Sequence, residues 1–139
     1  MSTSTLPGSN SQPSLGTGEW IRTFLLLQSA TFVLASMIHF GALLAGFADI
    51  RAAVPEGVIA AVLLGGLLAT WIRPRRIRSF AIGVQGFALA GTFVGLFVIA
   101  IGIGPSTMLD LATHSTMLAE LVGGLIVAVR ARATAGMPA

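Results

Sequence analysis

Four long apolar segments, separated by short breaks, dominate the sequence. They cover about residues 21–46, 54–72, 80–103 and 108–129. A helix needs about 20 apolar residues to cross the hydrocarbon core of a bilayer, so each segment is suited to one crossing. Charged residues make up only 9% of the chain, against roughly 25% in an ordinary soluble domain. The sequence therefore predicts an all-α, polytopic membrane protein, a bundle of four transmembrane helices, and argues against a soluble enzyme.

The two ends of the chain differ in composition from the apolar segments. Residues 1–18 are mostly Ser, Thr, Gly and Pro and carry no charge, which is typical of a disordered tail. They lack the basic start of a signal peptide, and the apolar run after them is too long for one. Residues 133–139 form a second tail, so the transmembrane domain is expected at residues 19–132. Because the chain has no cysteine, it holds no disulfide, thiolate metal site or iron–sulfur cluster.

Arginine is distributed unevenly between the two sides of the membrane. Arg51 alone lies on one side, and seven arginines lie on the other: Arg22, Arg73, Arg75, Arg76, Arg78, Arg130 and Arg132. Cytoplasmic loops of membrane proteins carry the excess of Lys and Arg, so both termini are expected in the cytoplasm (N-in/C-in) of a multi-pass protein in the inner (plasma) membrane. The same distribution explains the pI of about 11.5 without a nucleic-acid partner, and the expected partner is the lipid bilayer.

Several residues mark the expected helix boundaries. Pro55 falls in the first turn of the second segment, where its missing N–H costs nothing. Ser79 is expected to cap the third segment, which Gly104-Pro105 ends. Thr107, followed by Asp110 three residues later, resembles a capping box for the fourth segment.

Small residues recur at helical spacing and predict close helix contacts. Gly91 and Gly95 form a GxxxG motif in the third segment. Two further stripes are Gly57, Ala61, Gly65 and Ala69 in the second segment, and Gly41 and Ala45 in the first. Small residues let backbones approach closely in lipid. These stripes are expected either inside the bundle or at the seam of a homo-oligomer.

Polar side chains within the apolar segments are the candidate functional residues, because they are costly in a bilayer. They are His39, Glu56, Gln85, Thr92, His114 and Glu120. The two histidines and Glu56 are expected in the outer half of the bundle, with Glu56 only about 3 Å from the start of its helix. There Glu56 could simply complement the helix dipole, as Asp110 could simply be a cap. The histidines and Gln85 could equally be hydrogen-bonded interior side chains.

Glu120 lies about 16 Å into the fourth segment, close to the midplane. We expect it to be protonated or paired, and Ser36, Thr92 and His39 are the candidate partners. Its helical face is expected to point inward and consists of Thr113, Thr116, Glu120, Gly123 and Gly124. His114 is about 120° away around the same helix.

The stretch Glu56-Gly-Val-Ile-Ala-Ala-Val-Leu-Leu and the stretch from Gln85 to Pro105 resemble a group of small bacterial four-span membrane proteins of unassigned function. The resemblance extends from His39 to His114 and implies a four-helix inner-membrane protein, without an activity. Small multidrug-resistance transporters have a similar size, but they depend on a Glu in the first span, which this chain lacks. Fluoride channels tend toward balanced charge, unlike this chain, and no motif settles a comparison with DoxX-like proteins.

Three functions are compatible with these residues. The first is a non-enzymatic structural or accessory component of a membrane assembly or homo-oligomer, which the small-residue stripes and the lack of a nucleophile–base pair favour. The second is transport of a small solute or a proton, with Glu120 as the titrating group and Glu56, Gln85 and Thr92 as further polar residues. The third is a redox subunit that binds haem b through His39 and His114 as axial ligands.

Overall fold

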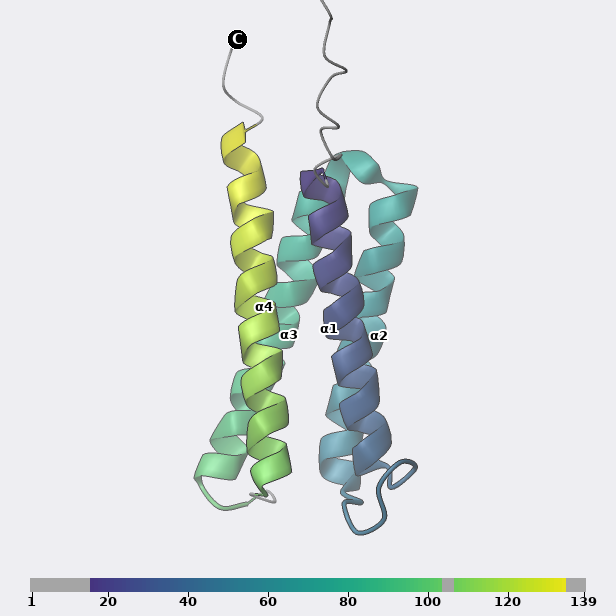
Figure 1. The fold of residues 1–139 in the computed structure, drawn as a ribbon, viewed down its shortest axis with the longest axis vertical. Coiled ribbons are helices and arrows are strands. Elements are labelled where there is room, and N and C mark those ends of the chain that lie inside the picture. The colour runs from purple at the N-terminus through teal and green to yellow at the C-terminus, as the bar shows by residue number, and fades with distance from the viewer. Residues whose placement is uncertain (1–15, 104–106, 135–139) are drawn as a thin grey trace, which may run out of the picture.

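The computed structural model describes residues 16–103 and 107–134, and within these ranges every regular element is a helix. The helices are α1 (Thr17–His39), α2 (Ile50–Ile72), α3 (Ile77–Ala100) and α4 (Met108–Thr134), with a short 3₁₀ turn, η1 (Pro74–Arg76), before α3 (Figure 1). All four are long and apolar enough to cross a membrane. The prediction of an all-α protein with four candidate spans is therefore confirmed.

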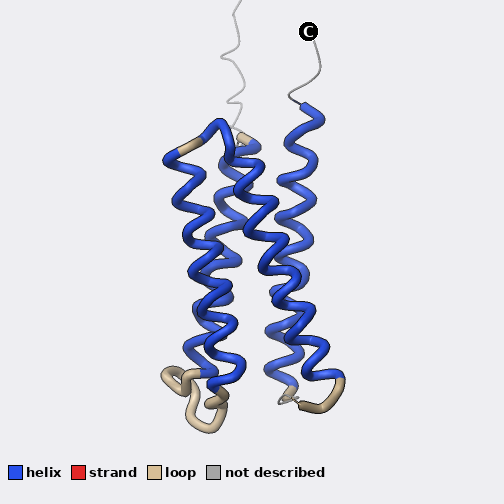
Figure 2. Tube along the Cα trace, turned by 180° about the vertical axis from the view of Figure 1, so that it is seen from behind, coloured by secondary structure: helices blue, strands red, loops and turns tan. Residues whose placement is uncertain are grey.

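The four helices run alternately up and down and pack side by side. α1 and α3 each pack against both α2 and α4. The start of α1, the η1 turn and the end of α4 lie together at one end of the bundle, the terminal end. The ends of α1 and α3 and the starts of α2 and α4 lie at the other end, the loop end (Figure 1 and Figure 2).

α1 ends seven residues before the predicted boundary at residue 46. Gly41 follows the helix with a φ of 74°, a left-handed conformation that suits glycine. Its N–H donates to the carbonyl of Ile38 at 2.8 Å, and the N–H of Ala42 donates to the carbonyl of Met37 at 3.0 Å. This is a Schellman motif, which ends the helix. The predicted stripe of Gly41 and Ala45 is therefore wrong, because both residues lie in the loop.

α3 ends in the same way, at Ala100 and not at residue 103. Gly102 has a φ of 75°, and the N–H groups of Gly102 and Ile103 donate to the carbonyls of Ile99 and Val98 at 3.0 and 3.1 Å. The predicted break at Gly104-Pro105 lies outside the described residues. The helix has already ended before it.

α2 begins four residues earlier than predicted. Asp49 is its N-cap, and the Asp49 side chain accepts a hydrogen bond from the N–H of Arg51 at 3.0 Å. Pro55 consequently lies in the second turn and not in the first. Glu56 is six residues from the start of α2, or about 9 Å along the axis. It is therefore too deep to act only on the helix dipole, whose effect falls off within the first turn.

The other boundaries differ from the prediction by a few residues. α1 begins at Thr17 and α4 ends at Thr134, so each helix includes two residues of a predicted tail. Residues 1–15 and 135–139 lie outside the described residues. Ser79 does not cap α3 but lies inside it, after the η1 turn. The predicted capping box is confirmed: the N–H of Thr107 donates to Asp110 at 2.9 Å, and the N–H of Asp110 donates to the Thr107 hydroxyl at 3.2 Å.

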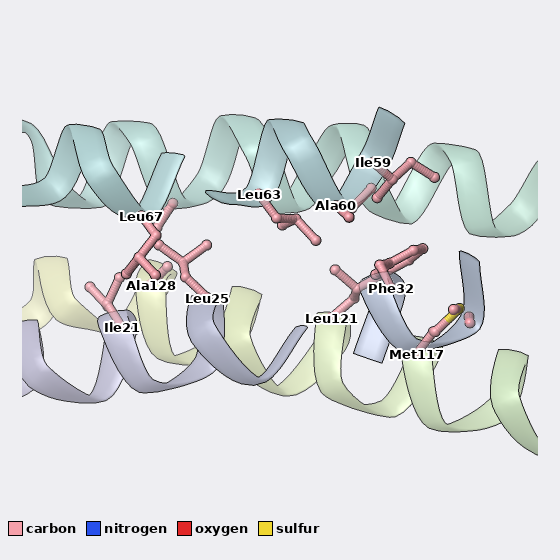
Figure 3. Packing of buried hydrophobic residues seen from close by; sticks show 13 residues of the cluster. Ile21, Leu25, Phe32, Ile59, Ala60, Leu63, Leu67, Met117, Leu121 and Ala128 are labelled. Atoms are coloured by element: carbon pink, nitrogen blue, oxygen red, sulfur yellow. The ribbon is translucent and has the colours of Figure 1, made fainter. Parts of the chain in front are cut away.

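The core contains apolar side chains from all four helices (Figure 3), and large ones such as Phe32, Leu63 and Leu121 are 0–1% exposed. Large apolar side chains also cover the outside of the bundle, among them Leu34, Val58, Leu68, Phe93, Phe97 and Ile126. A soluble monomer rarely exposes so much contiguous apolar surface. This surface is suited to a lipid environment.

Two glycines of α3 lie at helix contacts, as the GxxxG motif predicts. A Cβ on Gly91 would lie 2.6 Å from Cδ1 of Ile59 in α2, and a Cβ on Gly95 would lie 2.9 Å from Nε2 of His114 in α4. The predicted stripe on α2 is only partly inside the bundle, because Ala61 and Gly65 are exposed. α2 instead approaches α3 closely at Gly66, where a Cβ would lie 2.7 Å from the Val84 side chain.

Candidate functional site

His39 bridges two carboxylates in the loop-end half of the bundle. Its Nδ1 is 2.7 Å from Oε2 of Glu56, and its Nε2 is 3.1 Å from Oδ1 of Asp110. The three residues come from α1, α2 and α4 and are 3–6% exposed. We call them the His39 cluster. An ionised carboxylate can only accept hydrogen bonds, so when both carboxylates are ionised both ring nitrogens of His39 carry a proton.

The positions of these residues follow from the local structure of each helix. His39 is the last residue of α1, and Glu56 lies in the second turn of α2. Asp110 lies in the first turn of α4, where its Oδ2 accepts hydrogen bonds from the N–H and the hydroxyl of Thr107 at 2.9 and 2.6 Å. The other oxygen is left for His39. Asp110 is therefore both the predicted helix cap and a member of the cluster.

His114 lies one turn after Asp110 along α4, on the same face of the helix. Its Nδ1 is 2.8 Å from the backbone carbonyl of Asp110. A carbonyl oxygen only accepts, so Nδ1 is the donor and carries the proton. In the neutral ring Nε2 is then an acceptor, and it faces the bare backbone of Gly95, where a Cβ would come within 2.9 Å. The absence of a side chain at Gly95 makes room for this imidazole.

A cavity of about 180 Å³ lies beside the cluster. His39, Glu56, Asp110, His114 and Thr92 form part of its wall, and apolar side chains form much of the rest, including Phe32, Ile59, Val98, Ile99 and Met117. Asp49 and Arg51, at the start of α2, also line it. An apolar cavity with a few convergent polar groups is the usual form of a small-molecule site.

Glu56 has one oxygen that remains without a partner. Its Oε2 contacts His39, but its Oε1 is buried and accepts no hydrogen bond from the part of the chain that the structure describes. Buried polar groups in proteins are almost always paired with protein or water. Glu56, a residue of the cavity wall, thus keeps one buried oxygen as an open acceptor.

A second polar group lies deeper in the bundle, at Gln28 and Gln85. Nε2 of Gln28 donates to Oε1 of Gln85 at 3.1 Å and to the backbone carbonyl of Glu120 at 2.8 Å. Both glutamines are 0% exposed. Gly124 makes room for them, since a Cβ there would collide with both amides. Gln85 was among the predicted residues, whereas Gln28 was not, although an amide within the first apolar segment is a readable signal.

Glu120 does not line the cavity and is only partly buried. Its Oε1 accepts a hydrogen bond from the Thr31 hydroxyl at 3.1 Å. The three partners considered for it bond elsewhere: the Ser36 hydroxyl donates to the carbonyl of Ala53, Thr92 to the carbonyl of Ala88, and His39 contacts the two other carboxylates. Those candidate pairings are therefore wrong.

The inward face of α4 also differs from the prediction. The buried residues are Asp110, His114, Met117, Leu121, Gly124 and Ala128, whereas Thr116 is exposed. The Thr116 hydroxyl donates to the carbonyl of Ala112 in its own helix at 2.9 Å. A hydroxyl that bonds to a carbonyl of its own helix can lie on an exposed face, so the threonines did not identify the inward face.

The two histidines do not provide the pair of free ring nitrogens that a bis-histidine haem requires. Both nitrogens of His39 are held by carboxylates, and only Nε2 of His114 is free of the backbone. The arrangement of these residues therefore does not fit an axially ligated haem b. Within residues 16–103 and 107–134, no group of three or more His, Asp and Glu is arranged to hold a metal ion.

Comparisons of the chain with protein-family models, with curated proteins and with solved structures find no match.

Proposed function

We propose that this chain is a multi-pass membrane protein that binds a small solute in the cavity beside the His39 cluster. The observation that carries the proposal is the open acceptor of Glu56 in the wall of a largely apolar cavity. The cavity gives an apolar ligand group a place to bind, and the cluster supplies the polar contact that would fix its orientation.

A role as a purely structural or accessory bundle accounts less well for these residues. Buried charged groups are costly, and replacing them with apolar residues is often neutral or stabilising. An accessory bundle would be served as well by apolar residues at positions 39, 56 and 110. Assembly with a second copy or a larger complex remains compatible with solute binding, and the exposed Ala61 and Gly65 on α2 are where close packing would be easiest.

Binding can be tested with the purified protein in lipid nanodiscs. We expect at least one of three probes with the same ring, benzylamine, benzyl alcohol and benzoate, to raise the unfolding temperature in a saturable manner. A ligand at 100 times its Kd stabilises the folded state by about 2.7 kcal/mol. Val98→Phe places a ring in the cavity wall and should abolish the shift. Val122→Phe, on the exposed face of α4, is the matched control and should keep it.

The orientation in the membrane is part of the proposal. The arginine-rich terminal end would face the cytoplasm, so the cavity would lie in the outer half of an inner membrane. Trp20 and Trp71 support a membrane interface at the terminal end, because both are exposed and lie at the ends of α1 and α2. The resemblance to small bacterial four-span proteins agrees with this location.

Transport of the bound solute or of a proton is a second candidate function. The buried pair of Gln28 and Gln85 favours it, because it places polar groups beyond the apolar layer that contains Phe32. Uptake into proteoliposomes that is lost in Gln85→Leu, with solute binding retained, would support transport. Binding without uptake in the wild-type protein would exclude it.

A further inference from the structure

We infer that the ligand of this cavity is a small organic amine in its cationic form, with an apolar body about the size of a benzene ring. The inference rests on the proposed function and names the chemical class of the ligand.

The buried hydrogen-bonding groups of the cavity wall that lack a partner are acceptors, whereas the guanidinium of Arg51, which also lines the cavity, belongs to an exposed residue. Oε1 of Glu56 has no partner in the described part of the chain. Nε2 of His114 is an acceptor in the neutral ring, because Nδ1 donates to the carbonyl of Asp110. An ammonium group has only donors, up to three of them. Its donors therefore match acceptors of this kind, whereas a carboxylate ligand has no donor to offer either of them.

The charges in the cavity wall also favour a cationic ligand. Three carboxylates line the cavity, those of Asp49, Glu56 and Asp110, together with one guanidinium, that of Arg51. His39 sits between two of the carboxylates and offers one positive charge at most. With His114 neutral and the three carboxylates ionised, the wall keeps a net negative charge even when His39 is protonated. An uncompensated charge in apolar surroundings is costly, and a bound cation removes that cost.

The apolar part of the wall sets the size of the ligand. The cavity has a volume of about 180 Å³, and an apolar cavity of about 150 Å³ in another protein accommodates benzene. Phe32, Ile59 and Met117 line it on the side toward the middle of the bundle. A ring or a short branched chain fits there with its amine at Glu56. A large multi-ring cation does not.

The three probes that test binding also test this inference, because they differ only in the head group. In wild-type protein we expect benzylamine to bind at least tenfold more tightly than benzyl alcohol, and benzoate not to bind. This comparison requires no variant. Glu56→Gln should reduce benzylamine affinity at least tenfold and leave benzyl alcohol affinity within twofold. Glu120→Gln is the matched control, since Glu120 does not line the cavity, and it should leave benzylamine affinity unchanged.

The possible failures are distinguishable. If benzyl alcohol or benzoate binds as tightly as benzylamine, and Val98→Phe blocks that binding, the cavity binds a solute but the amine inference is wrong. If benzylamine binds equally well to Glu56→Gln, the inference is also wrong. If no probe binds the wild-type protein, or if Val98→Phe binds every probe as the wild-type protein does, the proposed function fails and the inference fails with it.

Discussion

At the scale of single residues, His39 determines whether two buried carboxylates are compensated. His39→Leu removes the donor from both Glu56 and Asp110, and breaking a buried ion pair in this way costs about 3–5 kcal/mol. We expect a loss of this size in the free energy of unfolding, measured by denaturant titration in mixed micelles. Adding Glu56→Leu to His39→Leu should recover part of it, because one unpaired charge is then gone. With Glu56→Leu alone completing the cycle, a double-variant cost equal to the sum of the two single-variant costs would show that the two side chains are not coupled.

The glutamine pair gives a second residue-scale prediction. Because a Cβ on Gly124 would collide with the Gln28 and Gln85 amides, Gly124→Ala should lower the unfolding temperature in detergent. Gly83→Ala is the matched control, since nothing lies near a Cβ at that position, and it should be neutral or slightly stabilising. The account of the pair would be wrong if both variants unfolded at the same temperature.

The sequence identified some of these residues and not others, for a physical reason. His39, Glu56 and His114 were placed in one half of the bundle because depth along a helix follows from a rise of about 1.5 Å per residue. Which of them touch depends on how the helices are rotated, and rotation is not determined by polar side chains that bond to their own helix. Asp110 was interpreted only as a cap for that reason, and Glu120 was paired with residues that bond elsewhere.

At the scale of the helix, substitutions of Gly91 and Gly65 are expected to have different effects on stability. Gly91→Leu must displace the Ile59 side chain, so we expect it to destabilise the bundle by about 1–3 kcal/mol. Gly65→Leu meets nothing within 4 Å and should leave the stability of the monomer unchanged. Thermal unfolding of both variants, with their mass in detergent from light scattering, checks this. A drop in mass for Gly65→Leu alone would place a second copy on that face of α2.

The helix ends show where sequence reasoning about elements is reliable. The box of Thr107 and Asp110 was predicted correctly, because both partners lie within one turn. Gly41 and Gly102 end their helices within apolar runs, so hydropathy alone extended α1 and α3 past them. Glycine as a stop signal depends on its left-handed conformation, and composition does not distinguish that role from a packing role.

At the scale of the whole molecule, the arrangement of charge at the two ends predicts the orientation in the membrane. Arg22 and Arg78 at the terminal end donate to the carbonyls of Thr70 and Ala128 at 3.1 Å. This end is therefore charged, and hydrogen bonds between helices also hold it together.

Ala48 lies in the loop at the other end, and both Ala48 and Ser79 are exposed. The chain has no native cysteine, so a single introduced thiol reports its own position. Ala48→Cys should react with an impermeant maleimide in intact cells, and Ser79→Cys should react only after the cells are permeabilised. Arg51→Ala at the loop end should leave this pattern unchanged, because the bias toward the terminal end becomes larger. The reverse labelling pattern would place the termini outside and the cavity toward the cytoplasm, and a solute would then reach the His39 cluster from inside the cell.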